Sequence, residues 1–189
     1  MTPTEAAIVL ELAQSKGALR YGKFQLSSGA ISSYYFDGRL VTLDPEGAYH
    51  IARAILPILR ECGAEAIAGP TVGADPIVAC VAVMSQLEGR PVPGLIVRKS
   101  PKGHGQKRMI EGPLTEGAKV AVVDDTCTSG SNLFHAIRAI ESQRCKVVKV
   151  IAILDRREGG SDDLKIAGYD FEALLECNEQ SEIIVSTPR

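Results

Sequence analysis

The sequence has 189 residues, of which 45% are hydrophobic and 23% are charged. These proportions are typical of one globular domain and exclude a disordered or fibrous chain. The formal net charge of −2 gives no electrostatic reason to expect a nucleic-acid partner.

The first third of the chain is predicted to form a helix, a hairpin and a second helix. Thr4–Lys16 is amphipathic with helical period, and Gly17 is placed to end that helix. Phe24–Arg39 is rich in aromatic residues, hydroxyls and glycine, which favours short strands or a hairpin. Residues 44 to about 61 are predicted to be helical, because their initial Asp-Pro pair suits an N-cap and a first helical position.

Apolar strands and helices alternate along the rest of the chain. Strands are predicted at 64–69, 92–99, 119–125 and 146–155, and helices at 75–89 and 129–143. Such apolar strands, alternating with helices, predict a doubly wound α/β fold whose mostly parallel sheet is flanked by helices on both faces. The tail after about Asp155 is less periodic, and we expect peripheral strands and a short helix there. We therefore expect a single domain over residues 1–189.

The cysteines and the N-terminus predict a cytoplasmic protein. Five cysteines lie far apart without a CxxC spacing, which argues against a disulfide framework and a zinc site: Cys62, Cys80, Cys127, Cys145 and Cys177. The first residues lack the basic start and apolar run of a signal peptide. No apolar run approaches the length of about 18 residues that a membrane span needs.

Three segments follow predicted strands: Gly69–Asp75, Arg98–Glu111 and Asp124–Ser131. In doubly wound sheets, ligands bind beyond the carboxyl ends of the strands, so these segments are the candidates for a site. The first joins a strand to a helix through two glycines and could present backbone N–H groups to an anion. Many strand-to-helix turns have this composition, so the signal is weak.

The stretch VVDDTCTSGSN, residues 122–132, is more specific. Two carboxylates end a buried strand, and hydroxyls and Gly130 precede a helix whose free N–H groups favour a phosphate. Helix capping and solvation would explain any one of these residues. However, Asp124 and Asp125 repel each other and neither is needed for capping. The pattern predicts a ribose 5-phosphate site, and the absence of GxxxxGK[ST] and GxGxxG argues against nucleoside triphosphates and nicotinamide cofactors.

Arg98–Arg108, which we call the cationic loop, contains five Lys or Arg residues and His104 but no acid. Most charge runs are simply solvated. Here, glycines and a proline predict a long loop at a strand end, which is typical of an active-site lid. A lid with this charge would bind a polyphosphate.

Four motifs together resemble the orotate phosphoribosyltransferases. VVDDTCTSGSN resembles the signature of type I phosphoribosyltransferases for phosphoribosyl diphosphate (PRPP), and RKSPKGHG, from Arg98, resembles the catalytic lid of the orotate enzymes. FQLSSGAISSYYFDGR, from Phe24, resembles their substrate segment, and LDRREGG, from Leu154, their strand-end arginine motif. The resemblance implies a glycosyltransferase of de novo pyrimidine synthesis that converts PRPP and orotate to orotidine 5-monophosphate and pyrophosphate.

The resemblance also implies residue roles. Asp124 and Asp125 approach the ribose hydroxyls, directly or through water and a Mg²⁺ ion that is bound mainly by PRPP. Further PRPP contacts fall on Arg98, Lys99, Lys102, His104, Thr126, Cys127, Thr128, Ser129, Gly130, Ser131 and Asn132. The catalytic roles fall on Lys99, Lys102, His104, Asp124 and Asp125. The orotate contacts fall on Thr128 and Arg156, with Tyr35 and Phe36 lining the base pocket.

At the level of the molecule, the resemblance implies a homodimer whose lid acts on the neighbouring subunit. It also implies a small base-binding hood built from about residues 1–40 and 156–189. The sequence departs from many members at Ser27, where they have a lysine, and at Ala30 and Ile31, where they have basic residues. Fewer fixed cations then face the substrates, so the lid and Arg156 carry more of the charge.

Two alternatives remain open. Salvage enzymes for purines or uracil share the PRPP loop, and the cationic loop together with Arg156 argues against them. A PRPP-binding regulator would keep the fold without the reaction, but it should carry a basic nucleic-acid face or an added DNA-binding domain.

Overall fold

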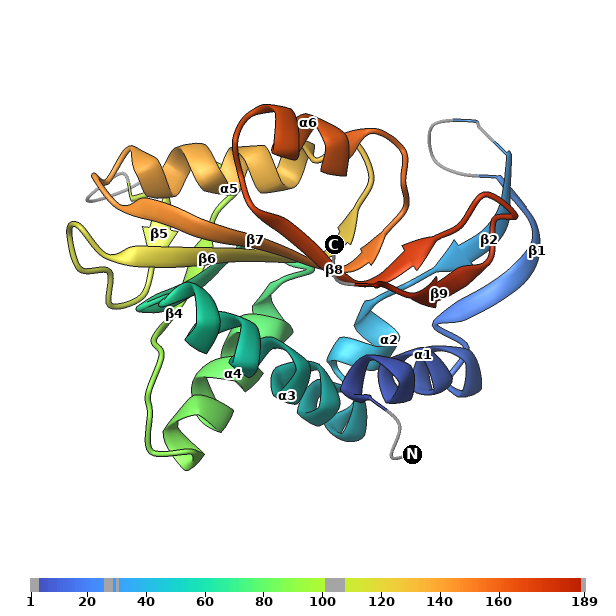
Figure 1. Cartoon of the computed structure of the whole chain (residues 1–189), viewed down its shortest axis with the longest axis horizontal. Helices are drawn as coiled ribbons and strands as arrows, with labels where there is room; N and C mark the ends of the chain where they lie inside the picture. Colours follow the sequence, from blue (N-terminus) through green and yellow to red (C-terminus); the bar gives the residue numbers. More distant parts are fainter. Residues whose placement is uncertain (1–3, 26–28, 30, 101–107, 188–189) are drawn as a thin grey trace.

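The computed structural model describes residues 4–25, 29, 31–100 and 108–187. Its centre is a sheet with helices on both faces (Figure 1). The strand order is β5-β4-β3-β6-β7-β8-β9, in which β5 and β9 are antiparallel to their neighbours and the other strands are parallel. The strands are β3 (Ala66–Pro70), β4 (Gly94–Val97), β5 (Ile110–Glu111), β6 (Lys119–Cys127), β7 (Lys146–Asp155), β8 (Phe171–Cys177) and β9 (Ile183–Val185). The predicted mostly parallel sheet is confirmed.

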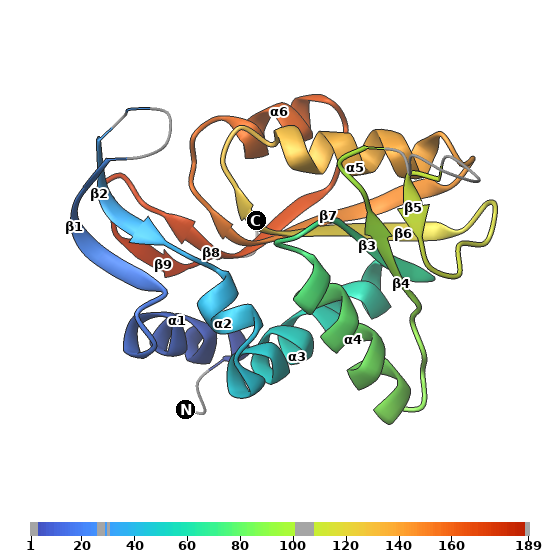
Figure 2. The same ribbon diagram turned by 180° about the vertical axis from the view of Figure 1, so that it is seen from behind.

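The helices divide between the two faces, as Figure 2 shows from behind. One side carries α1 (Glu5–Ser15), α2 (Arg39–Thr42), α3 (Pro45–Cys62) and α4 (Asp75–Leu87), and the other carries α5 (Ser131–Glu141) and α6 (Gly160–Ile166). Along β7, Ile151 and Ile153 pack in the core under α3 and α4, while Val150 and Ala152 pack under α5. Both faces of the strand are buried, which explains its continuous apolar sequence.

The predicted helix ends are confirmed by their capping contacts. Thr4 Oγ1 accepts a hydrogen bond from the Ala7 N–H at 3.2 Å. Asp44 caps α3 by accepting from the N–H groups of the second and third helical residues, at 3.1 and 3.0 Å. Gly63 ends α3 with a φ of 67°, a conformation that favours glycine.

Within the described residues, no helix is long and apolar enough to cross a bilayer.

The N-terminal hairpin pairs β1 (Leu19–Gln25) with β2 (Ile31–Phe36) and lies beside β9 (Figure 1). Tyr21 Oη accepts a hydrogen bond from the Ile183 N–H at 3.0 Å, so residues 162 positions apart join the two ends of the chain. The strands predicted within 24–39 are confirmed, although β1 begins earlier, at Leu19. That this region forms a base-binding hood stays a prediction.

The structure extends one predicted strand and adds two short elements. β6 runs to Cys127 rather than Asp125, because the longer β7 continues the ladder and pairs Thr126 with Leu154 and Cys127 with Asp155. The peripheral strands expected after Asp155 are β8 and β9, which form one edge of the main sheet, where β8 pairs in parallel with β7. The short α2 and β5 were not predicted, since elements of four and two residues have no readable period.

Candidate active site

A cleft of about 230 Å³ opens at the carboxyl ends of β3 and β6. It also receives residues from β2, from the start of the cationic loop and from α5. Its lining residues are Tyr35, Phe36, Asp37, Arg39, Pro70, Thr71, Val72, Gly73, Lys99, Asp124, Asp125 and Asn132. The structure therefore brings together six predicted site residues: Tyr35, Phe36, Lys99, Asp124, Asp125 and Asn132.

Two carboxylates form the floor of this cleft. Asp124 is only 3% exposed, and its Oδ1 accepts a hydrogen bond from the Asp125 N–H at 3.0 Å. Asp125 Oδ1 accepts another from Thr126 Oγ1 at 3.2 Å. Burial, and secondly the charge of Asp125, raise the pKa of Asp124 to about 8. In the absence of a ligand, Asp124 therefore favours its protonated form at neutral pH.

Two glycines let the backbone approach these carboxylates closely. A Cβ at Gly73 would lie 2.7 Å from Asp125 Oδ1 and 3.1 Å from Asp124 Oδ1. A Cβ at Gly38 would lie 2.9 Å from the Asp125 Cβ. The turn after β3, which the sequence marked only weakly, is thus one wall of the carboxylate site.

The loop from β6 into α5 has the features of a phosphate cradle. Gly130 precedes α5 with a φ of 72°, and no side chain caps the helix. The N–H groups of the first turn therefore remain available to an anion. Thr128, Ser129, Ser131 and Asn132 are exposed around them. That these residues hold the 5-phosphate stays a prediction.

Cys127 does not share this exposure. Its side chain is fully buried in the core between β6 and α5. Burial, followed by the charges of Asp155 and Asp124, raises the pKa of the thiol to about 12. Although Cys127 was counted among the PRPP contacts, its thiol lies beneath the binding surface and stays protonated at neutral pH.

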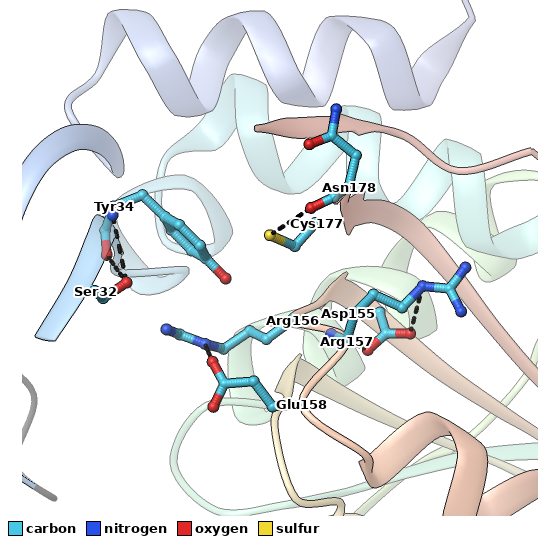
Figure 3. Close-up of polar contacts among 8 residues, drawn as sticks. All are labelled: Ser32, Tyr34, Asp155, Arg156, Arg157, Glu158, Cys177 and Asn178. Carbon is cyan, nitrogen blue, oxygen red and sulfur yellow. Dashed lines mark hydrogen bonds and ion pairs between the residues drawn. The ribbon is translucent and has the colours of Figure 1, made fainter. Parts of the chain in front are cut away.

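Arg156 directly follows β7. It lies next to residues 126–132, the loop from β6 into α5, which we call the phosphate loop. Its N–H donates to the Cys127 carbonyl at 2.9 Å, and its Nε donates to Glu158 Oε1 at 2.8 Å. The guanidinium lies over the Tyr34 ring, with Cζ 4.8 Å from the ring centroid (Figure 3). Neither Tyr34 nor Glu158 was predicted from the sequence. Alternation along β2 could have marked Tyr34, since it buries this residue and Phe36 on one face.

Tyr35 lies on the other face of β2. Its ring centroid is 5.7 Å from that of Phe24, and the Arg20 guanidinium lies 5.2 Å from its centroid. Tyr35 lines the cleft with the two carboxylates, but it does not share the Arg156 contact. The two aromatic residues assigned to the base pocket therefore occupy different faces of the hairpin.

The chain matches a family model for the phosphoribosyl transferase domain over residues 44–173. An orotate phosphoribosyltransferase from Nostoc sp. is 47% identical over 159 residues, which cover 84% of this chain and 77% of that protein. Another from Aquifex aeolicus is 41% identical and covers 82% of this chain and 85% of its own length. The chain belongs to the orotate phosphoribosyltransferase family.

A solved orotate phosphoribosyltransferase is similar along nearly the whole chain. The Mycobacterium tuberculosis protein in complex with PRPP has a TM-score of 0.75 and 27% identity. The match covers 92% of this chain and 96% of that one. The fold predicted from the resemblance is thereby confirmed.

The base of the cationic loop is described, whereas two of the lid residues assigned by resemblance to the orotate phosphoribosyltransferases are not. The Arg98 N–H donates to the Met109 carbonyl at 2.8 Å, and His135 Nε2 of α5 lies 2.8 Å from the Arg98 carbonyl oxygen. Lys99 enters the cleft with the two carboxylates. Lys102 and His104 lie outside the described residues, as do Ser27 and Ala30.

Proposed function

We propose that this chain transfers the phosphoribosyl group of PRPP to orotate, giving orotidine 5-monophosphate and pyrophosphate. The observation that carries the proposal is one strand-end region that combines a carboxylate pair, an uncapped helix N-terminus and an arginine. These suit ribose hydroxyls, a phosphate and a substrate carboxylate, respectively. Curated relatives named orotate phosphoribosyltransferase support the choice of orotate over other bases.

The residues present also fit Mg²⁺. Within the described chain no cluster of three or more His, Cys, Asp or Glu side chains could hold a metal alone. Magnesium is commonly held by one or two carboxylates and by substrate phosphates, which suits Asp124 and Asp125 in their glycine-walled cleft. When bound, Mg²⁺ would supply charge neutralisation to the leaving pyrophosphate.

The protein groups then have separate tasks in the reaction. A bond forms between an orotate nitrogen and C1 of the ribose, and the bond from C1 to the pyrophosphate oxygen breaks. Asp124 and Asp125 orient the ribose through its hydroxyls, and residues 126–132 hold the 5-phosphate. Lys99 stabilises charge on pyrophosphate. The same task is proposed for Arg98, Lys102 and His104 on the basis of the sequence.

We also propose a homodimer in the cytoplasm. Apolar side chains are exposed on α2 and just after it, on α3 and in the turn after β3: Leu40, Leu43, Tyr49 and Val72. We propose that a second copy of the chain covers them. The family resemblance predicts that the cationic loop of this second copy acts on the cleft. Light scattering should give the mass of a dimer, and a monomer at working concentrations would contradict the shared lid.

An absorbance assay for orotate consumption tests the reaction. Purified protein with PRPP and Mg²⁺ should consume orotate and release pyrophosphate, while parallel samples with uracil, hypoxanthine and adenine should turn over far more slowly. Faster turnover of any of these bases would identify a salvage enzyme. No turnover with any base, combined with PRPP binding, would favour the regulator.

Arg156→Ala tests the base site. Loss of a charge-assisted pair to the substrate carboxylate should raise the KM for orotate by about 10- to 100-fold. The KM for PRPP should change little, because the phosphate loop is intact. Steady-state kinetics with each substrate varied in turn measure both constants, and an unchanged KM for orotate would exclude Arg156 from the base site.

A further inference from the structure

Arg156 is held at its backbone by β6, but that contact leaves its long side chain free to rotate. The Arg156 N–H donates to the Cys127 carbonyl at 2.9 Å, and the Gly160 N–H donates to the Thr128 carbonyl at 2.9 Å. These bonds fix where the arginine starts. Its side chain is nevertheless only 10% exposed, so neighbouring groups must determine where the guanidinium lies.

Tyr34 provides a flat surface for the guanidinium. The residue is 4% exposed, and its ring centroid is 4.8 Å from the Arg156 Cζ. Ser32 holds the Tyr34 backbone, since Ser32 Oγ donates to the Tyr34 carbonyl at 2.7 Å. Within the described residues the Tyr34 hydroxyl is buried without a hydrogen-bond partner. The ring, rather than the hydroxyl, is therefore the part of Tyr34 that serves Arg156.

Glu158 occupies one edge of the same guanidinium. Its Oε1 accepts from the Arg156 Nε at 2.8 Å, and Figure 3 shows Tyr34 and Glu158 on either side of the arginine. Among the described residues, the Nη1 and Nη2 atoms of Arg156 have no hydrogen-bond partner. Both atoms also remain partly accessible to solvent. The terminal edge of the fork is thus open to a ligand, and two parallel N–H groups suit a carboxylate.

We propose that Tyr34 and Glu158 are positioning residues for Arg156, the ring fixing the plane of its guanidinium and the carboxylate blocking its Nε edge. The Nη1–Nη2 edge is thereby presented to the substrate carboxylate. This inference rests on the proposed function, because it assumes that Arg156 binds orotate. Glu158 acts through its position more than its charge, since its side chain is 45% exposed and therefore screened by solvent.

Paired truncating and conservative variants test the proposal by steady-state kinetics. Tyr34→Leu should raise the KM for orotate by about fivefold or more, and Glu158→Ala by about threefold, as expected for lost cation–π and ion-pair contacts. Tyr34→Phe keeps the ring and Glu158→Gln keeps an acceptor, so both should stay within about twofold of the parent protein. For every variant, kcat and the KM for PRPP should stay nearly constant, which general damage to the fold would not permit.

Glu176→Gln is the matched control. Glu176 pairs with Arg157, the next arginine along the chain, and should leave the KM for orotate unchanged. In an Arg156→Ala background, the Tyr34 and Glu158 truncations should add no further rise. Because Glu158 is largely exposed, its variants keep the test valid even if Tyr34→Leu fails to fold.

The outcomes separate the inference from the proposed function. If Arg156→Ala raises the KM for orotate while Glu158→Ala leaves it unchanged or lowers it, Glu158 does not position the arginine. The positioning proposal then fails and the proposed function stands. If Arg156→Ala leaves the KM for orotate unchanged, the positioning proposal fails together with the assignment of Arg156 to the base site. The proposed function fails only if the parent protein does not consume orotate in the absorbance assay.

Discussion

At Asp124, a buried carboxyl group lies beside a second carboxylate, and both burial and charge favour its protonated form. Binding of a cation or of ribose hydroxyls favours the ionised form instead. Without ligand, Asp124 is therefore mainly protonated, whereas its ligands bind the ionised form. Such conflict between stability and binding is expected where polar groups are buried for function.

Asp124→Asn should stabilise the apo protein while removing most activity. The pKa of Asp124 is near 4 in the unfolded chain and about 8 in the folded protein. Between these two pH values the unfolded chain ionises more readily, so the cost that Asp124 adds to folding grows as the pH rises. Asparagine has no such cost. The gain in unfolding free energy should therefore grow with pH, level off above about pH 8 and reach at least about 1 kcal/mol.

Thermal denaturation at several pH values without ligand measures this gain. A gain that is the same at pH 5 and pH 9 would show that the Asp124 proton is not its source. Glu11→Gln, on the exposed surface of α1, serves as the control and should show no comparable trend.

Single residues also show how far the sequence could be taken at the site. The carboxylate pair, the hydroxyl loop and Arg156 were recognisable because their chemistry is unusual at strand ends. Tyr34 and Glu158 were not. Alternation along β2 could mark Tyr34 as buried, but it does not show a cation–π contact with an arginine 122 positions away in the chain. Glu158 lies only two residues after Arg156, but the sequence does not show that its side chain turns back to the arginine. The exposed or buried state of Cys127 likewise depended on the length of β6.

At the scale of elements, the phosphate loop and α6 meet backbone to backbone. A Cβ at Gly160 would lie 2.3 Å from the Gly130 nitrogen and 2.5 Å from the Thr128 carbonyl oxygen. The start of α6 thus supports the loop directly, and only glycine permits this approach. The shape of the cradle depends on two helices from different parts of the chain.

Gly160→Ala should raise the KM for PRPP and lower stability by about 1–3 kcal/mol, because the added methyl group must displace the loop. Kinetics and thermal denaturation measure the two effects. Gly117→Ala is the control: Gly117 has a φ of 81° with no atom within 4 Å of its Cβ position, so it carries strain without a clash. It should lose stability while keeping the KM for PRPP, and equal kinetic effects in both variants would contradict the supporting role of Gly160.

Helices and long strands were predictable to within a few residues, since their periodicity and caps are local. β6 was predicted too short because two aspartates, which strands disfavour, suggested its end, whereas pairing with β7 continues the strand through Thr126 and Cys127. The sequence predicted peripheral strands after Asp155, but their pairing partners are decided by tertiary structure, which places β8 beside β7.

At the scale of the whole molecule, the first and last segments of the chain form one region. The Tyr21 hydroxyl and the Ile183 N–H make a direct contact between the hairpin and β9 at 3.0 Å. The alternation of strands and helices predicted the central sheet, but it did not predict the contact between the N-terminal hairpin and β9. The expectation of a hood came from family resemblance alone.

Tyr21→Phe should weaken this junction by about 1 kcal/mol, the usual contribution of one hydrogen bond, and lower the Tm by about 2–4 °C for a chain of this size. Scanning calorimetry measures the shift. Tyr169→Phe loses a hydroxyl that contacts Glu141 on the surface, and it should change the Tm less. If both variants behave alike, the Tyr21 contact has no special part in joining the two ends.

The two short antiparallel strands at the sides of the sheet have a consequence for solubility. β5 pairs with the last two residues of β4, and β9 pairs with the last three residues of β8. Outermost strands otherwise offer free N–H and C=O groups on which further chains can assemble into aggregates. Because β5 and β9 are short and cover the ends of β4 and β8, the seven-stranded sheet presents a poor template for such growth. Precipitation on heating should accordingly follow loss of the native sheet rather than precede it.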